Sequence, residues 1–294
     1  MKPAPFEYTL AETVEEAIAL LDDGDGDAMI IAGGQTLMPM MALRMARPER
    51  VVDINGIEEL AGISEDADEV IIKACTRQTA ALESKLVANR LPLLAKAIAF
   101  VGHQQTRNRG TVGGSLSLGD PASEIPLAAL TMNAYVTLRS VEGSRTVPMG
   151  AFFLGPMMTA CESNELMVSV HFPCSTNSDR IGTSFHEVNE RHGDFAIVAA
   201  AAQIHLNDKD VCTGAAVAIG GAHDRPVRIP GLEAKLVGNK IDAEVIQSAL
   251  QEISKPIDPF DDQHAGADYR RHTAEILAER AINDAVADAN GDAQ

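Results

Sequence analysis

Cysteine is scarce in this 294-residue sequence, and its four cysteines, Cys75, Cys161, Cys174 and Cys212, lie far apart. No CxxC pair is present, so the sequence has neither a disulfide framework nor the ligand pattern of an iron–sulfur cluster or a zinc site. The eight histidines form no HExxH motif or other close ligand spacing. We therefore expect buried thiols and no metal bound by this chain alone.

Basic residues are also few, with 24 lysines and arginines against 42 acidic residues and a formal net charge of −18. Surfaces that bind nucleic acids or anionic membranes need clustered Lys and Arg, so this balance argues against both. The acidic residues are spread along the chain, which favours a role in solubility. Any phosphate must then be held locally by backbone donors rather than by the overall field.

Long apolar runs are missing as well. The N-terminus, MKPAPFEYTL, lacks the apolar segment of a secretory signal, and no uninterrupted apolar stretch reaches the length of a membrane span. The composition, 46% hydrophobic and 22% charged, is typical of a soluble globular protein, and the length allows two domains or one large one. We expect a cytoplasmic protein.

Apolar periodicity predicts that helices and strands alternate over the first 100 residues or so. Pro39 falls in the first turn of the second predicted helix, where no internal N–H bond is lost. The expected helices span residues 14–22, 36–46 and 91–102, and the expected strands span 28–32, 51–54 and 69–75.

The centre of the chain, residues 106–130, contains four glycines and two prolines, too many for one regular element. A second group of turn-forming residues, at 173–183, indicates a domain boundary. The remaining patterns predict strands at 135–140, 145–149, 165–173, 182–188, 196–206 and 212–221, and helices at 233–238, 243–253 and 270–289.

A glycine pair joins the second predicted element to the third, in the stretch IIAGGQTLMPMM at 30–41. A strand that delivers Gly33 and Gly34 into a helix exposes backbone N–H groups without partners, and glycine lets a ligand approach them closely. Thr36 could cap the helix or donate its hydroxyl to a phosphate. The spacing is neither GxGxxG nor GxxxxGK[ST], which argues against a Rossmann or ATPase site.

A second glycine loop, RNRGTVGGS at 107–115, strengthens the prediction, because two such loops could grip one diphosphate. The alternative is a plain turn, with Arg107 and Arg109 facing a phosphate, a partner subunit or only solvent. The following LGDPASEIP contains Glu124, whose carboxylate suits ribose hydroxyls. Ordinary helix capping by Ser123 or Asp120, with Glu124 in the first turn, explains it equally well.

Four motifs together carry a resemblance to a known family. AGGQT at 32–36, RNRGTVGGS at 107–115, GDPASEIP at 119–126 and RHGDFAIV at 191–198 occur in this order. In this the chain resembles the flavin-binding medium subunit of the molybdenum hydroxylases, the group of aerobic carbon monoxide dehydrogenase and nicotine dehydrogenase. The FAD domain of xanthine dehydrogenase is a more distant relative. The resemblance covers nearly the whole chain.

The resemblance implies an α+β fold in two domains. The first, residues 1–175, would be a vanillyl-alcohol-oxidase-type (PCMH-like) FAD-binding domain with lobes at about 1–56 and 57–175. The second, residues 176–294, would be a smaller domain with an antiparallel sheet and helices. In the family both glycine loops contact the FAD diphosphate, and no catalytic side chain is demanded because the protein only binds, orients and tunes the flavin.

The resemblance also implies which residues bind FAD. Glu124 would lie near the ribose, and Phe195 would lie beside the isoalloxazine unless Gly193 and Asp194 simply turn the chain into a strand. The implied cofactor-binding residues are Ala32, Gly33, Gly34, Gln35, Thr36, Leu37, Val101, Gly102, Thr111, Gly114, Ser115, Leu118, Asp120, Glu124, Leu166, Met167 and Phe195.

Two departures from the family pattern stand out. Gln35 and Thr36 replace His or Asn and Ser, and both keep hydrogen-bonding groups. Where many relatives carry a lysine, this chain has Phe185, His186 and Glu187. Charge near a flavin tunes its electronics, so we expect a different flavin potential.

The function that the resemblance implies is electron transfer within a larger enzyme. A large subunit would hold the molybdenum cofactor, a small subunit would hold two [2Fe–2S] clusters, and this chain would pass electrons through FAD to an external acceptor. The expected assembly is a dimer of heterotrimers. Two alternatives stay open: a free-standing FAD-dependent oxidoreductase, and a nucleotide-binding assembly module without redox chemistry.

Overall fold

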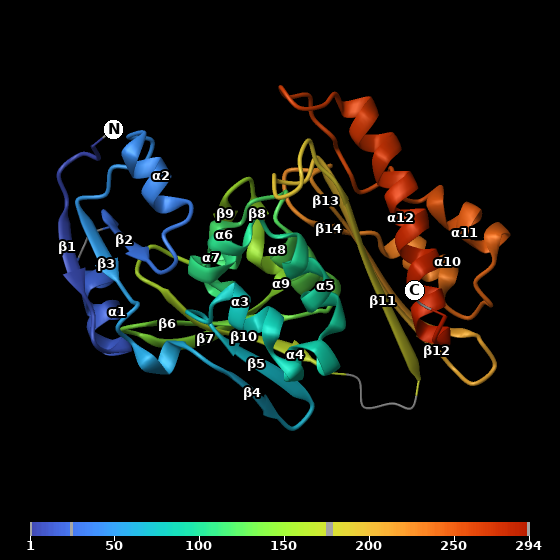
Figure 1. Ribbon diagram of the computed structural model, residues 1–294, viewed down its shortest axis with the longest axis horizontal. Helices are drawn as coiled ribbons and strands as arrows, with labels where there is room; N and C mark the ends of the chain where they lie inside the picture. Colours follow the sequence, from blue (N-terminus) through green and yellow to red (C-terminus); the bar gives the residue numbers. More distant parts are fainter. Residues whose placement is uncertain (1, 24–25, 175–178, 293–294) are drawn as a thin grey trace.

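A computed structural model describes residues 2–23, 26–174 and 179–292 of the chain. The three larger of the four described sheets lie in a row along its longest axis, with the N-terminus at one end and the C-terminal helix at the other (Figure 1). Among the described helices, none combines the length and the apolar character that crossing a bilayer would require. The predicted domain boundary between residues 175 and 176 lies outside the described residues.

The first lobe is a parallel sheet of three strands with two helices. Its strand order is β1-β3-β2, so the carboxyl ends of β2 and β3 meet at one edge. Thr13 starts the first helix by accepting a hydrogen bond from the backbone N–H of Glu16 at 3.1 Å. The elements are β1 (Glu7–Leu10), α1 (Val14–Asp22), β2 (Ala28–Ile31), α2 (Leu37–Ala42) and β3 (Arg50–Asp53).

The second lobe is an antiparallel sheet with helices over one face. The strand order β4-β5-β10-β6-β7 places β10, late in the chain, at the centre. The strands are β4 (Ile63–Asp66), β5 (Glu69–Lys73), β6 (Tyr135–Ser140), β7 (Gly143–Pro148) and β10 (Leu166–Pro173), with a small pair β8 (Phe153–Gly155) and β9 (Met158–Thr159). The helices are η1 (Glu58–Leu60), α3 (Gln78–Glu83), α4 (Lys85–Arg90), α5 (Pro92–Phe100), α6 (Gln104–Arg109), α7 (Val112–Leu118), α8 (Glu124–Thr131) and α9 (Met149–Phe152).

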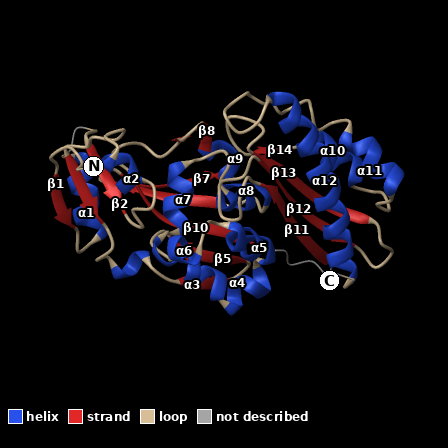
Figure 2. Ribbon diagram, turned by 45° about the horizontal axis from the view of Figure 1, so that its top comes forward, coloured by secondary structure: helices blue, strands red, loops and turns tan. Residues whose placement is uncertain are grey.

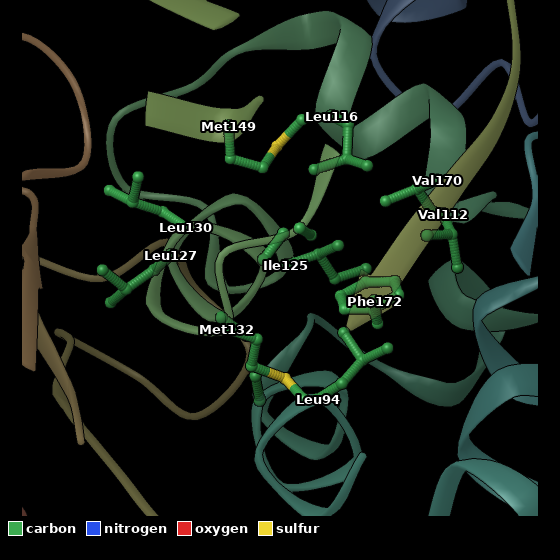
Figure 3. Close-up of a cluster of buried hydrophobic side chains, with 14 of the residues drawn as sticks. Leu94, Val112, Leu116, Ile125, Leu127, Leu130, Met132, Met149, Val170 and Phe172 are labelled. Atoms are coloured by element: carbon green, nitrogen blue, oxygen red, sulfur yellow. The ribbon is translucent and has the colours of Figure 1, made fainter. Parts of the chain in front are cut away.

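The main core lies between this sheet and its helices. Alternation along β10 turns Val170 and Phe172 toward the helices, where they meet Leu94, Val112 and Ile125 (Figure 3). Each large apolar side chain buried there contributes about 1.5–3 kcal/mol. The short helices that carry the second glycine loop are therefore fixed to the sheet by packing.

The C-terminal body is an antiparallel sheet covered by three helices. Its strands are β11 (Arg180–Val188), β12 (Val198–Leu206), β13 (Cys212–Gly220) and β14 (Val227–Arg228), and its helices are α10 (Pro230–Leu236), α11 (Ala243–Leu250) and α12 (Ala267–Asn290). Helices α5 and α8 lie between this sheet and the five-stranded one (Figure 2). Lys96 on α5 donates to the Thr183 carbonyl at 2.5 Å and to Asp288 at 2.9 Å.

Most predicted elements are confirmed, with two informative differences. The predicted helix at 36–46 ends at Ala42, since Arg44 adopts a left-handed φ of 59° that an α-helix cannot continue. The stretch 106–130 holds more than one element, as predicted: its apolar end is α8, while the end of α6 and all of α7, which are too short to give a clear apolar period, had not been predicted.

Candidate functional site

The first glycine loop, Ala32–Thr36, leaves β2 and enters α2. Gly34 has a left-handed φ of 69°, which places consecutive N–H groups on one side of the chain. Within the described residues, the backbone N–H groups of Gly33, Gly34, Gln35 and Thr36 donate no hydrogen bond. Thr36 occupies the cap position of α2, but its side chain makes no capping bond. The loop therefore presents four free donors, the arrangement that binds an anion.

The two glycine loops touch. A Cβ atom added to Gly33 would lie 2.5 Å from the carbonyl oxygen of Arg109 and 2.8 Å from the Cα of Gly110. No side chain fits in that space, so glycine is required at position 33 for the loops to approach each other. The two loops therefore meet, and the prediction that they grip one diphosphate stays a prediction.

Arg77 fastens this junction from the side. Its Nη2 donates to Asn55 Oδ1 at 2.6 Å, and its Nη1 donates to the Arg109 carbonyl. Asn55 in turn donates to the carbonyl of Ala32 at 2.8 Å. One guanidinium thus connects the start of the first loop to the start of the second.

The second glycine loop uses its own donors differently. The N–H of Gly113 donates to the Ala74 carbonyl at 2.9 Å, and the N–H of Gly114 donates to Thr111 Oγ1 at 3.0 Å. The N–H of Ser115 donates to the Thr111 carbonyl at 3.2 Å. These bonds anchor the loop to the residue after β5 and to its own helix, so most of the free amides belong to the first loop, and the second loop has a free N–H at Thr111 within the described residues.

A pocket of about 310 Å³ lies at the junction. Arg109 is the one cation and Asp53 the one carboxylate among the described residues that line it. Asp53 accepts hydrogen bonds from Tyr8 at 2.8 Å and from the Asn55 side chain at 2.6 Å. The residues that line the pocket are Ile31, Ala32, Gly33, Gly34, Gln35, Met38, Pro39, Asp53, Asn55 and Arg109. The volume suits part of a dinucleotide rather than all of it.

A second group of predicted residues lies at the other end of α6. Arg107 donates to the carbonyls of Val101 and Gly102 at 2.8 and 3.0 Å. The turn formed by Gly193, Asp194 and Phe195 packs against the residues just before α6, because a Cβ on Gly193 would lie 2.4 Å from the His103 ring. Phe195 follows with 58% of its surface exposed. Helix α6 spans only six residues, about 9 Å, so this corner and the pocket are neighbours.

Three carboxyl groups lie where α8 meets the C-terminal sheet. Burial raises the pKa of Glu124 to about 7, and the nearby Asp120 adds to that effect. Burial and the neighbouring Glu124 raise the pKa of Glu187 to about 8. Within the described chain Glu187 Oε2 is buried without a hydrogen-bond partner, while its other oxygen accepts from Asn189 at 2.8 Å. Asp120 accepts from the Ala122 N–H at 2.9 Å in the turn before α8, and Ser123, the N-cap residue, makes no side-chain capping bond, so neither residue caps the helix as the alternative interpretation expected.

The other predicted residues occupy different surroundings. Leu166 and Met167 are buried, the first in the core of the first lobe and the second in the main core. Leu37 and Leu118 are half-buried at the beginning of α2 and the end of α7. The structure thus brings the two loops together and places Val101 and Gly102 nearby.

Sequence reasoning missed three residues of the junction: Asp53, Asn55 and Arg77. Asp53 ends β3 and Asn55 follows it, and β3 pairs in parallel with β2. A signal for them was present, since parallel neighbours deliver their carboxyl ends to the same edge of a sheet. Nothing in the sequence around Arg77 indicates its bridging role.

Two family models match the chain. Residues 4–175 match the FAD binding domain in molybdopterin dehydrogenase, and residues 183–285 match the CO dehydrogenase flavoprotein C-terminal domain. Together these matches cover most of the chain. The first of them contains both glycine loops.

Relatives match over nearly their full length. The chain is 36% identical to 6-hydroxypseudooxynicotine dehydrogenase complex subunit alpha of Paenarthrobacter nicotinovorans, covering 97% of this chain and 96% of that protein. It is 36% identical to the carbon monoxide dehydrogenase medium chain of Hydrogenophaga pseudoflava, covering 98% and 99%. A solved carbon monoxide dehydrogenase from the same organism superposes with a TM-score of 0.94, at 36% identity and over 98% and 99% of the two chains.

Proposed function

The chain belongs to the FAD-binding medium subunits of the molybdenum hydroxylases, and on that premise we propose that its Ala32–Thr36 loop holds the FAD diphosphate. One observation carries the proposal: this loop has four unpartnered amides, and three of them, on Gly33, Gly34 and Gln35, belong to residues that line the pocket at the junction with the second loop. A diphosphate offers several acceptor oxygens, and a nest of backbone donors matches them. The donor set therefore fits the cofactor.

The role of the chain is to carry FAD in an oxidoreductase whose molybdenum and iron–sulfur cofactors belong to partner subunits. FAD held by this chain would supply the redox chemistry that links the partner's clusters to an external acceptor. The residues of this chain bind and orient it. Gly33 allows the close approach of the loops, Arg77 and Asn55 fix their spacing, and Thr111 holds the second loop in shape.

The remaining predicted contacts extend this proposal along the cofactor. Val101 and Gly102 would border the flavin end, with Phe195 as the exposed aromatic beside it; the short span of α6 supports their closeness to the pocket. Glu124 would face the ribose. Its raised pKa supports a carboxyl that is protonated in part near neutral pH and can donate as well as accept a hydrogen bond.

Partner subunits are part of this function, as the relatives are medium chains and subunits of multi-subunit dehydrogenases. The finer assembly we propose is a dimer of heterotrimers with a large molybdenum subunit and a small [2Fe–2S] subunit, located in the cytoplasm. Four free thiols in the described chain support a reducing compartment. The domain division at residue 175 is likewise proposed, supported by family matches that end at 175 and resume at 183.

Two measurements test the function. The purified chain should take up one equivalent of FAD and show a flavin absorption spectrum; failure after FAD addition would favour a nucleotide-binding module without redox chemistry. Affinity purification of the tagged chain from its source should recover two partners, one with molybdenum and one with iron. A lone chain that oxidises an organic substrate would instead make it a free-standing oxidoreductase.

A further inference from the structure

Arg109 ends α6 at the edge of the pocket, and its guanidinium has no partner there. It makes neither an ion pair nor a side-chain hydrogen bond within the part of the chain that the structure describes. The two other arginines of this region are engaged: Arg77 bridges the loops, and Arg107 holds the carbonyls that follow α5. Arg90, another exposed arginine, pairs with Glu65 at 2.9 Å.

The backbone of Arg109 is held firmly although its side chain is exposed. Its carbonyl accepts from Arg77 and lies 2.5 Å from the position that a Cβ on Gly33 would take. The side chain therefore starts from a fixed point directly beside the four free amides. A guanidinium placed there adds a full positive charge to a nest that supplies only partial charges.

A positive charge in the pocket would offset the negative charges around it. A diphosphate would enter beside the Asp53 carboxylate, on a chain whose formal net charge is −18. Both repel it. We propose that Arg109 is the cationic partner of the FAD diphosphate, an inference that rests on the proposed function of the loop. Its planar fork can bind two phosphate oxygens through two parallel N–H donors, a bidentate geometry that an ammonium group does not offer.

The test compares three variants of the full-length chain after its flavin is removed: Arg109→Ala, Arg109→Lys and the control Arg90→Ala. Affinities for FAD and for riboflavin, which has no phosphate, are measured by flavin fluorescence over a salt series. We expect Arg109→Ala to weaken FAD binding about 10- to 100-fold. The riboflavin affinity of Arg109→Ala should equal that of the wild type. The FAD affinity of Arg109→Lys should fall between those of the wild type and Arg109→Ala.

The salt series separates a phosphate contact from a general folding defect. FAD affinity of the wild type should fall as salt rises, and that of Arg109→Ala should fall less, because one screened contact is gone. Equal FAD affinities in Arg109→Ala and Arg90→Ala would overturn this inference and leave the loop assignment intact. Equal losses for FAD and riboflavin would also overturn it. A wild-type chain that binds no FAD would overturn the proposed function itself.

Discussion

Arg77 donates a hydrogen bond to Asn55 Oδ1 over 2.6 Å, and this contact crosses from the second lobe to the first. The same guanidinium donates to the carbonyl of Arg109. Asn55 also holds the carbonyl of Ala32. The distance between the two glycine loops is thus set by one side chain with two donors in a fixed fork.

Replacing Arg77 should therefore weaken FAD binding without unfolding the chain. Arg77→Lys keeps the charge but cannot reach both acceptors with a planar fork, and Arg77→Ala removes both bonds. Hydrogen bonds of charged groups contribute about 1.5–3 kcal/mol when they are well formed. Because the Arg77–Asn55 hydrogen bond is exposed, we expect a loss of about tenfold in FAD affinity for both variants, measured by titration of the flavin-free chain. An affinity for Arg77→Lys that matches the wild type would show that the fork does not set the spacing.

Gly33 offers a sharper test of the close approach. Gly33→Ala puts a methyl group 2.5 Å from the Arg109 carbonyl, so the loops must separate. Gly33→Asp adds a negative charge beside the diphosphate, and Gly114→Asp puts its Cβ 2.7 Å from Thr111 Oγ1. Both aspartate variants should purify without flavin.

The matched control is Gly150→Asp, since a Cβ at Gly150 meets nothing within 4 Å. It should keep the flavin content of the wild type. Far-ultraviolet circular dichroism of every variant checks that the fold survives. Stoichiometric flavin in both Gly33→Asp and Gly114→Asp would mean that the loops do not hold the cofactor.

Local sequence patterns were enough to predict the glycine loops, because Gly33 and Gly34 stand between an apolar run and a helical period. Thr111 carries a similar local signal as a cap before a short helix. These features depend on neighbours along the chain. The fold class, by contrast, came from the resemblance of four motifs in order.

Contacts between distant segments escaped prediction. Arg77 meets Asn55 across 22 positions and Arg109 across 32, and no pattern in the sequence encodes those pairs. The central position of β10 in its sheet is likewise a matter of packing. The unequal use of amides by the two loops also depends on tertiary contacts, since Gly113 is bonded to Ala74.

The buried carboxyls predict how stability changes with pH. The pKa of Glu124, about 7, and that of Glu187, about 8, lie above the ordinary 4.5. Between pH 4.5 and 8 the folded chain therefore binds more protons than the unfolded chain, so these groups stabilise it below pH 4.5 and that contribution is lost as the pH rises to 8.

Glu187→Gln should remove much of that loss. Its amide carries no charge and can donate to Glu124. We expect the thermal midpoint of the variant to exceed that of the wild type by about 2–4 °C at pH 8.5 and to match it at pH 5. Glu59→Gln, at an exposed position, is the control and should follow the wild type at both values. An equal shift at pH 5 and 8.5 would rule out the carboxylate as the cause.

Cys75 provides the last prediction, because it lies next to the strand that anchors the second loop. Its side chain is 7% exposed, and burial raises the pKa of its thiol to about 11. The thiolate is the reactive form, so the native chain should leave Cys75 unmodified by a thiol reagent at pH 8. Cys75→Ala should keep full flavin content and lower the free energy of unfolding by about 1 kcal/mol, the typical effect of a single substitution. Absorbance of bound flavin and thermal unfolding measure the two effects, and loss of flavin at an unchanged thermal midpoint would give this thiol a direct part in the site.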